Sequence, residues 1–397
     1  MGSSPTTLIR PLAPSEATFA TFGIYVGYAT LVRGRLDTTA LMEAFRALQR
    51  AYPVLASRIA DDSGRSVLER ADGAGAISRC ERNSGDPLAG LPDPRSRAAL
   101  VHIAPDDCDQ TWVTLLTHHS IADGHHALQL LADLWALYTD IVEGREIWTN
   151  RHGYPRPAEQ LLAERGVTGD PGEPMDWSTQ LGQHPDPAPP STPATVRTRL
   201  TAAETKALIA FGHRENTTIN GLVSAALLRA EAEVRGVGVG GLTYRYVVDL
   251  RTRVDPPMGY TDGTNVLGLA TFVADADAYP GIAHLARAIN DEFARDLASG
   301  TIQRSALRLP EQFAASGDVD VQSTNWGRIP PLRTPSDASI EDFRPLGHTV
   351  GASLASGGWP RAMHIITTFA GQLTIDSEVT GSPTTDRIRA LLTELPG

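Results

Sequence analysis

The sequence predicts an α/β protein of the α+β kind, built from two similar sandwich lobes. The chain has 397 residues, 41% of them hydrophobic, which suffices for two or three domains at about 150 residues each. Helical and strand-like segments mix irregularly in both halves, unlike the regular alternation of a doubly wound parallel sheet. A proline-dense stretch near the middle is typical of an extended linker. We therefore expect an N-terminal lobe over residues 1–183, a linker over 184–198 and a C-terminal lobe over 199–397.

The first half carries two helical patterns on either side of a strand-rich region. Apolar residues recur at helical spacing over residues 38–52, and Pro53 closes that pattern. Residues 62–100, rich in Gly, Asp and Arg, are typical of short strands and turns. The apolar residues 112–116 predict a strand, and an amphipathic helix follows to about residue 142.

The second half restarts with a capping box, in which Thr201 and Glu204 mark the beginning of a helix. Gly300 is well placed as the residue that follows the end of another helix. The remaining elements that we expect are helices at 218–234, 282–297 and 385–395, a buried strand at 242–249, and a hairpin at 363–376 that turns at residues 370–372.

Composition excludes several classes of function. A formal net charge of −11 argues against nucleic-acid binding, which requires a basic face. No apolar run approaches the length of a transmembrane segment, and because the first twenty residues have no apolar stretch behind a basic start, we expect no secretory signal. Cys80 and Cys108 are too few for a disulfide framework and lack metal-ligand spacing. We expect a cytoplasmic protein.

The most informative segment is residues 117–126, which contains four of the eleven histidines together with Asp123 and Gly124. Imidazole has an unperturbed pKa close to neutrality, so it can accept and return a proton at working pH. Because the segment separates the predicted strand from the predicted helix, we expect it to lie where the buried scaffold meets a cleft.

Three interpretations of this histidine cluster stand side by side. In the structural one, the histidines cap the helix or fill a polar pocket. In the metal one, His119 and Asp123 bind an ion from one helix face, although Gly124 weakens a helix there and no HExxH or CxxC partner occurs. In the catalytic one, His119 is a general base, Asp123 fixes the loop, and Gly124 permits a tight turn.

Residues His118–Gly124 match the HHxxxDG motif of the condensation-domain and CoA-dependent acyltransferase superfamily. Extended by His125 and His126, the motif resembles that of the polyketide-associated acyltransferases, the family of the phthiocerol dimycocerosyl transferases. The resemblance covers most of the chain, because further family-like segments follow in the same order at residues 52–57, 248–251, 264–268 and 296–303.

The resemblance implies two chloramphenicol-acetyltransferase-like lobes with a tunnel between them. A thioester donor and a hydroxyl acceptor would meet at His119, which would act as the general base without an acyl-enzyme. Asp123 would be a structural carboxylate paired with Arg251, and His118 would support the loop. No metal and no bound cofactor are implied. Acyl-CoA or a phosphopantetheine-linked acyl thioester would serve as co-substrate.

The acceptor side departs from the best-known branch of the family, since residues 323–328 resemble the SNWG-like strand of the broader superfamily. Asn325 is the candidate oxyanion stabiliser by position and residue type, and a structural role at the end of the strand is the alternative. Thr264 and Asn265 are candidates for the tunnel lining. The acceptor stays open among the hydroxyl of a polyketide, a lipid alcohol and another secondary metabolite.

Two donors also stay open, namely free acyl-CoA and an acyl group held on an acyl carrier protein or a polyketide synthase. The resemblance implies an acidic carrier, which would require a basic patch on this acidic chain. The candidate members of that patch are Arg304, Arg308, Arg328 and Arg333. The alternative functions are an amide-forming condensation enzyme and a non-catalytic carrier-protein-binding homologue.

Overall fold

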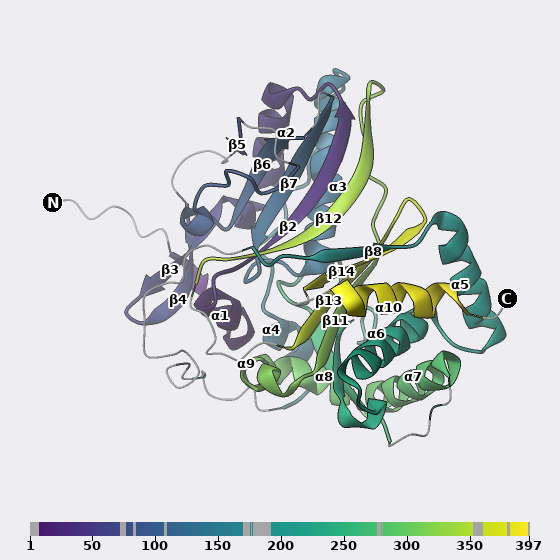
Figure 1. Ribbon diagram of the computed structural model, residues 1–397. Helices are drawn as coiled ribbons and strands as arrows, with labels where there is room; N and C mark the ends of the chain where they lie inside the picture. Colours follow the sequence, from purple (N-terminus) through teal and green to yellow (C-terminus); the bar gives the residue numbers. More distant parts are fainter. Residues whose placement is uncertain are drawn as a thin grey trace.

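The chain folds into two lobes, each with a sheet covered by helices, and a small third sheet beside them (Figure 1). These features come from a computed structural model. The residues that it describes are 8–71, 77–81, 85–106, 109–169, 175, 177, 192–275, 279, 281–351, 360–378 and 382–395.

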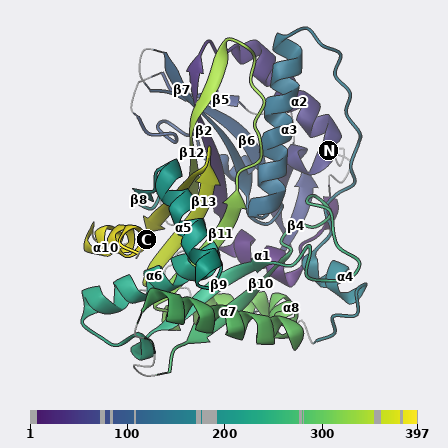
Figure 2. The same ribbon diagram turned by 90° about the vertical axis from the view of Figure 1, so that its right-hand side faces the viewer.

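The N-terminal lobe is built on a five-stranded sheet. In spatial order its strands are β12 (Ala338–Thr349), β2 (Ile24–Gly34), β7 (Gln110–His118), β6 (Ala99–Pro105) and β5 (Ile77–Arg79). All neighbours are antiparallel except β5 and β6, which are parallel. Helices α2 (Thr38–Ala51) and α3 (Gly124–Val142) pack against each other and cover one face of this sheet (Figure 2).

Local signals explain where these two helices begin. The side chain of Asp37 accepts hydrogen bonds from the backbone N–H groups of Thr39 and Ala40 at the beginning of α2, and Asp123 accepts one from His126 at the beginning of α3. Strand β7 and helix α3 confirm the predicted strand and helix. Only five residues separate them, so the histidine cluster lies at the end of a central strand.

The C-terminal lobe contains a six-stranded sheet and four longer helices. In spatial order the strands are β10 (Leu267–Val273), β9 (Thr243–Asp249), β11 (Val321–Arg328), β13 (Ala362–Phe369), β14 (Gln372–Glu378) and β8 (Val196–Arg199). Strand β11 is parallel to both of its neighbours, and the other pairs are antiparallel. The helices are α5 (Ala202–Arg214), α6 (Ile219–Arg235), α7 (Ile282–Ala298) and α10 (Ser382–Thr393).

The helix boundaries and the hairpin turn predicted for this lobe are confirmed. Thr201 and Glu204 form both hydrogen bonds of the capping box at the beginning of α5. Gly300 follows α7 in the left-handed region at φ 74°. The predicted hairpin consists of β13 and β14, and its turn places Ala370 at φ 49° and Gly371 at φ 78°.

Shorter elements complete the fold. Strands β1 (Leu8–Pro11), β4 (Arg65–Arg70) and β3 (Ser57–Asp62) form the third sheet. The short helices are α1 (Pro14–Thr21), α4 (Ala158–Ala163), α8 (Thr301–Ser305) and α9 (Leu309–Ala314). Short 3-10 turns lie at Pro53–Ala56, Pro94–Ser96, Val239–Gly241, Ala306–Arg308 and Ala315–Asp318.

The two lobes exchange elements across the predicted boundary. Strand β12 comes from the C-terminal half but pairs with β2 along the edge of the N-terminal sheet. Helix α4 comes from the N-terminal half but packs into the C-terminal core through Leu161 and Leu162. The ranges 1–183 and 199–397 therefore do not coincide with the packed units at these elements. Residues 184–191 of the predicted linker lie outside the described residues, and its end is part of β8.

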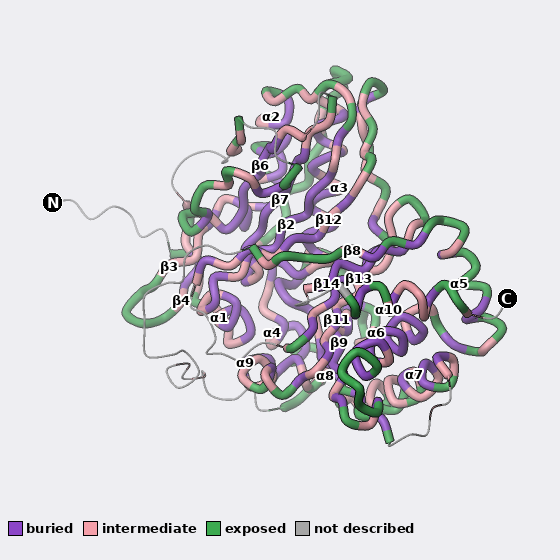
Figure 3. The backbone as a smooth tube through the Cα atoms, in the orientation of Figure 1, coloured by how far each residue is buried: buried purple, intermediate pink, exposed green. Residues whose placement is uncertain are grey.

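Buried residues follow the strands of both large sheets and the helix faces that cover them (Figure 3). Within the described ranges, no helix combines the length and apolar character that crossing a bilayer requires.

Candidate active site

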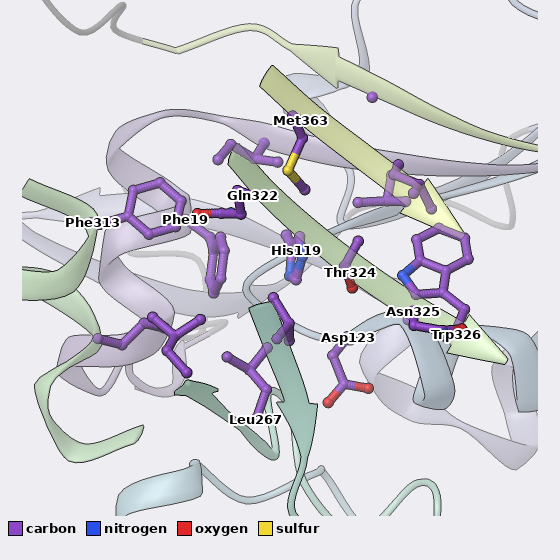
Figure 4. A pocket seen from close by; sticks show the side chains of 18 of the residues that line it. Phe19, His119, Asp123, Leu267, Phe313, Gln322, Thr324, Asn325, Trp326 and Met363 are labelled. Atoms are coloured by element: carbon purple, nitrogen blue, oxygen red, sulfur yellow. The ribbon is translucent and has the colours of Figure 1, made fainter. Parts of the chain in front are cut away.

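Residues from both lobes enclose a cavity of about 460 Å³. The C-terminal sheet is its floor: Val247 and Asp249 of β9 face the cavity, whereas Tyr246 and Val248 face the helix-covered core. This alternation follows from the two-residue period of a strand. The opposite wall comes from α1, β2, the end of β12 and the beginning of α3, and His119 lies inside the cavity (Figure 4).

The end of β7 and helix α1 position His119. Its backbone N–H donates to the carbonyl of Ile24 over 2.8 Å, which continues the pairing of β7 with β2. Its imidazole stacks on Phe19, with ring centroids 4.0 Å apart and an interplanar angle of 2°. Figure 4 shows Phe19 on one side of His119 and Thr324 on the other. The ring is therefore fixed in orientation while it borders the cavity.

Asn265 fixes the tautomer of His119 through a reciprocal pair of hydrogen bonds. The amide Nδ2 of Asn265 donates to the backbone carbonyl of His119 over 2.8 Å. The amide oxygen Oδ1 therefore faces the ring, where it lies 2.9 Å from Nδ1. Because Oδ1 can only accept, the imidazole proton is on Nδ1, and Nε2 carries the lone pair.

Burial lowers the pKa of His119 below its ordinary value, since it penalises the charged imidazolium. A contact with its own backbone carbonyl, the charge of Asp123 and the Asn265 amide oppose this shift without reversing it. His119 is therefore neutral at neutral pH, the form in which Nε2 can accept a proton.

Asp123 anchors the loop to the C-terminal lobe. Its oxygens accept hydrogen bonds from the Arg251 guanidinium over 2.9 and 3.0 Å and from the backbone N–H of Val266 over 2.9 Å. Arg251 is only 2% exposed and also contacts Asp249 over 2.9 Å. The two side chains that the resemblance pairs are thus joined by a buried bidentate bridge between the lobes.

Electrostatics hold the Asp123 carboxylate in its charged form. Burial by itself raises the pKa of Asp123, but the charges of Arg251 and His125 and the hydrogen bonds outweigh burial and bring the pKa to about 2. The carboxylate points away from His119 (Figure 4). That geometry does not support the metal interpretation, which requires both side chains to face one ion.

The other histidines of the cluster are bound in distinct ways. Nδ1 of His118 accepts the backbone N–H of Ser120 over 3.1 Å, and burial lowers the pKa of His118 to about 3. Nδ1 of His126 lies 3.0 Å from the carbonyl of Gly263, and burial lowers its pKa to about 4. His125 borders the cavity, with Nε2 3.9 Å from a carboxylate oxygen of Asp249.

The predicted reason for Gly124 is wrong. Gly124 is the first residue of α3, and it does not adopt a positive φ. A Cβ atom at this position would lie 2.8 Å from the indole nitrogen of Trp326. Close packing against Trp326 therefore requires glycine here, whereas a tight turn does not.

The three candidates for the acceptor side lie in different surroundings. Asn325 lines the cavity, where its amide nitrogen donates to Asn220 over 2.8 Å. Thr264 is fully buried behind the loop and donates to Glu16 over 2.9 Å, so its assignment to the tunnel lining is wrong. Asn265 is buried too and binds His119 instead of lining the cavity.

The four arginines predicted for carrier docking do not form one patch. Arg304 lies in α8 and Arg308 just after it, where Nε of Arg308 is 3.6 Å from Glu311. Arg333 binds Asp140 of α3 over 2.5 Å, and Arg328 is exposed at the end of β11. Figures 1 and 2 both place α8 in the C-terminal lobe and α3 in the N-terminal lobe, so the set divides between two regions.

Sequence analysis missed several residues that contact the cluster. Phe19 stacks on His119. Glu16 in the same helix is fully buried, and its backbone carbonyl accepts a hydrogen bond from Ser120 over 2.7 Å. Arg245 and Gln322 line the cavity floor. No local pattern marks these residues, because their contacts join segments that are distant in the sequence.

Comparisons with known proteins agree along the length of the chain. Residues 189–378 match the family model described as the C-terminus of phthiocerol/phthiodiolone dimycocerosyl transferase. A phthiocerol/phthiodiolone dimycocerosyl transferase of Mycobacterium sp. (strain JLS) is 31% identical over 403 residues, which cover 98% of this chain and 97% of that protein.

Solved structures share the two-lobe fold. Polyketide synthase associated protein 5 from Mycobacterium tuberculosis is similar with a TM-score of 0.83 and 28% identity over 99% of both chains. The first condensation domain of the CDA synthetase is similar with a TM-score of 0.68 and 15% identity, over 97% of this chain and 96% of that one. The predicted fold, two chloramphenicol-acetyltransferase-like lobes, is confirmed.

Proposed function

Since this chain belongs to the phthiocerol/phthiodiolone dimycocerosyl transferase family, we propose that it transfers an acyl group from a thioester to a hydroxyl, with His119 as the general base. Family membership makes the chain an acyltransferase and confirms the resemblance found in the sequence. Its relatives are named for dimycocerosyl transfer to phthiocerol or phthiodiolone. A lipid or polyketide alcohol is the acceptor class that we propose here.

The observation that carries this proposal is the position of Nε2 of His119. Asn265 holds the proton on Nδ1, and the ring borders a cavity that both lobes enclose. In the proposed reaction, Nε2 takes the acceptor proton while the hydroxyl oxygen attacks the thioester carbonyl. The C–S bond then breaks, and the imidazolium returns the proton to the departing thiolate. Such general-base assistance contributes on the order of 10²–10⁴-fold.

The tetrahedral intermediate requires a hydrogen-bond donor for its oxyanion. Asn325 remains our candidate, because the residue lines the cavity and, among the contacts of the described residues, its amide nitrogen retains one N–H beyond its bond to Asn220. Gly327 donates to the amide oxygen over 2.7 Å and so fixes the orientation of this amide.

The donor is a thioester of coenzyme A or of a phosphopantetheine arm. Among the predicted docking arginines, we favour Arg304 for binding the phosphate groups of such a donor. Arg304 borders a second cavity of about 260 Å³ together with Arg165 and Arg253. The structural relative named polyketide synthase associated protein 5 supports a carrier-bound donor as the second candidate.

Free thiol release tests the proposed reaction. The protein is incubated with acetyl-CoA, longer acyl-CoAs and acyl carrier protein thioesters, each with a panel of alcohols and matched amines. We expect thiol release that depends on the alcohol, and an ester product in mass spectrometry. An amide product would support the condensation alternative. Silence with every donor would contradict catalysis and support the carrier-binding alternative.

The pH dependence of kcat/KM follows from the state of His119. A general base acts only when neutral, and burial lowers the pKa of His119 below 6.5. The rate constant is therefore at its plateau at pH 7 and falls as the pH drops through that lowered pKa, by about tenfold per unit below it. An acidic midpoint above pH 7 would contradict this assignment.

Replacing Asn265 by aspartate moves that midpoint upward. The carboxylate keeps an acceptor beside Nδ1, but its negative charge favours the imidazolium and raises the pKa of His119. We expect an upward shift of roughly one pH unit or more, measured from the kcat/KM profile. Asn290→Asp is the matched control, because Asn290 contacts Thr217 and Thr218 away from the cavity. An unchanged midpoint in Asn265→Asp would rule out the positioning role.

A further inference from the structure

One register row crosses the cavity floor, with Arg245 at one end and Glu378, whose pKa burial raises to about 7, at the other. On adjacent strands Arg245 pairs with Gln322, Gln322 with Met363, and Met363 with Glu378, and all four residues line the cavity. At about 4.8 Å between strands, the two ends of this row are roughly 14 Å apart. Gln322 and Met363 line the same cavity as His119 (Figure 4). The Arg245 end of the row therefore belongs to the same cavity as the reacting atoms.

The guanidinium of Arg245 is buried without a carboxylate. The residue is 3% exposed, and burial lowers its pKa to about 10, which leaves it charged at neutral pH. It donates to the Gln322 side chain over 2.7 Å, to the backbone carbonyl of Gln312 over 2.8 Å and to the hydroxyl of Ser316 over 2.7 Å. Each of these acceptors is neutral. In the described part of the chain, no carboxylate oxygen lies within 4.0 Å of Arg245.

Arg251, which also lines the cavity, differs in this respect. It is equally buried, but Asp123 and Asp249 neutralise it at 2.9 Å. A buried charge without a counter-ion is costly, so an anion that enters the cavity gains from neutralising Arg245. The arginine forms four hydrogen bonds to its neutral partners. Among the contacts of the described residues, one of its five N–H donors, on Nη1, remains for a ligand.

Gln322 contributes to the same subsite. Its Oε1 accepts from Arg245, which turns its amide nitrogen away from the guanidinium. Gln312 and Ser316 flank Phe313, whose ring packs edge-on against Phe19 with centroids 5.6 Å apart. Phe19 in turn stacks on His119. An apolar wall thus connects the anchored arginine with the base.

We propose that Arg245 and Gln322 form a carboxylate-binding subsite that selects a substrate with an acidic group near its reacting end. This inference rests on the proposed function and deepens it by naming a substrate class. A single free N–H beside one amide suits the two oxygens of a carboxylate. The carboxylate belongs either to the acyl group, as in a dicarboxylic acyl thioester, or to the acceptor, as in a hydroxy acid.

Calorimetric titration distinguishes the two sources without requiring turnover. One arm compares succinyl-CoA with the neutral, similarly shaped 4-oxopentanoyl-CoA, and the other compares a hydroxy fatty acid with its methyl ester. In one arm we expect the wild-type protein to bind the carboxylate ligand roughly 10- to 100-fold more tightly than its neutral analogue. This factor corresponds to the free energy of a hydrogen bond to a charged group. Equal affinities in both arms would overturn the proposal.

Four variants locate the effect. Arg245→Gln removes the preference, and Arg245→Lys, which keeps the charge without the planar fork, retains part of it. Gln322→Leu weakens the preference for the carboxylate and leaves the charge of Arg245 and its contacts with Gln312 and Ser316 in place. This variant therefore tests the subsite even if Arg245→Gln does not fold. Arg229→Gln is the matched control, because Arg229 bonds the carbonyl of Tyr279 and does not line the cavity.

Different experimental results would contradict the proposed function and this inference. A folded Arg245→Gln protein, or a Gln322→Leu protein, that keeps the full preference for the carboxylate overturns the subsite even if acyl transfer proceeds. A carboxylate preference that depends on Arg245, in a protein that releases no thiol with any donor, contradicts the proposed function alone.

Discussion

Replacing His119 by alanine is expected to lower the rate of acyl transfer sharply while the fold survives. The imidazole borders the cavity and its side-chain hydrogen bond is to Asn265, so its removal leaves both sheets and the Asp123–Arg251 bridge intact. Loss of the proposed base is expected to lower kcat on the order of 10²–10⁴-fold. The measurement is thiol release under saturating donor, together with the thermal midpoint and circular dichroism.

His213→Ala is the matched control for this variant. His213 is exposed in the last turn of α5 and lies outside the cavity lining, so its loss leaves turnover unchanged. Turnover of His119→Ala within tenfold of wild type, in a folded protein, would remove His119 from the role of base. A large loss of stability would instead indicate that the ring mainly supports the fold.

Replacing Asp123 by alanine is expected to destabilise the protein by about 3–5 kcal/mol, the usual cost of breaking a buried pair. Arg251 would stay buried at 2% exposure with half of its carboxylate partners lost. The backbone N–H groups of His126 and Val266 would lose their acceptor as well. The measurement is the free energy of unfolding from denaturant titration.

A double variant separates the pair from the individual side chains. Removing Arg251 as well, in Asp123→Ala/Arg251→Met, eliminates the uncompensated charge, so the double variant loses less stability than the sum of the single losses. Glu292→Ala is the surface control: its 3.5 Å pair with Arg295 is exposed, and we expect a change within about 0.5 kcal/mol. Wild-type stability of Asp123→Ala with turnover lost would contradict the structural role.

The elements that the sequence predicts well are those whose signals are local. Thr201 and Glu204 cap α5 within one turn, and Gly300 adopts its left-handed conformation directly after α7. Asp123 is likewise both the motif carboxylate and the cap of α3. Periodicity also predicted β7 and α3, because each buries one consistent set of side chains. Such features depend on neighbouring residues and need no information about the rest of the fold.

Strand β2 shows where this approach fails. It lies between β12 and β7 in the N-terminal sheet, and residues 25–30 are all buried, so it lacks the alternation that marks a strand with one exposed face. Strand β12 joins the same sheet from the other half of the chain. No local composition signals that crossing, because the partner edge exists only after the N-terminal lobe has folded.

By itself, the sequence determined the family, the two-lobe architecture, the motif histidine and the ion pair of Asp123 with Arg251. The tertiary structure alone decided how these residues are held. Asn265 reaches His119 across 146 residues, Thr264 turns to Glu16 across 248, and Arg245 meets Gln322 across 77. The physical reason is that hydrogen bonds form only between groups within about 3 Å of each other. The position of the proton on His119 and the lack of a counter-ion at Arg245 therefore depend on which groups the packed lobes bring together. That proximity is a property of the fold as a whole.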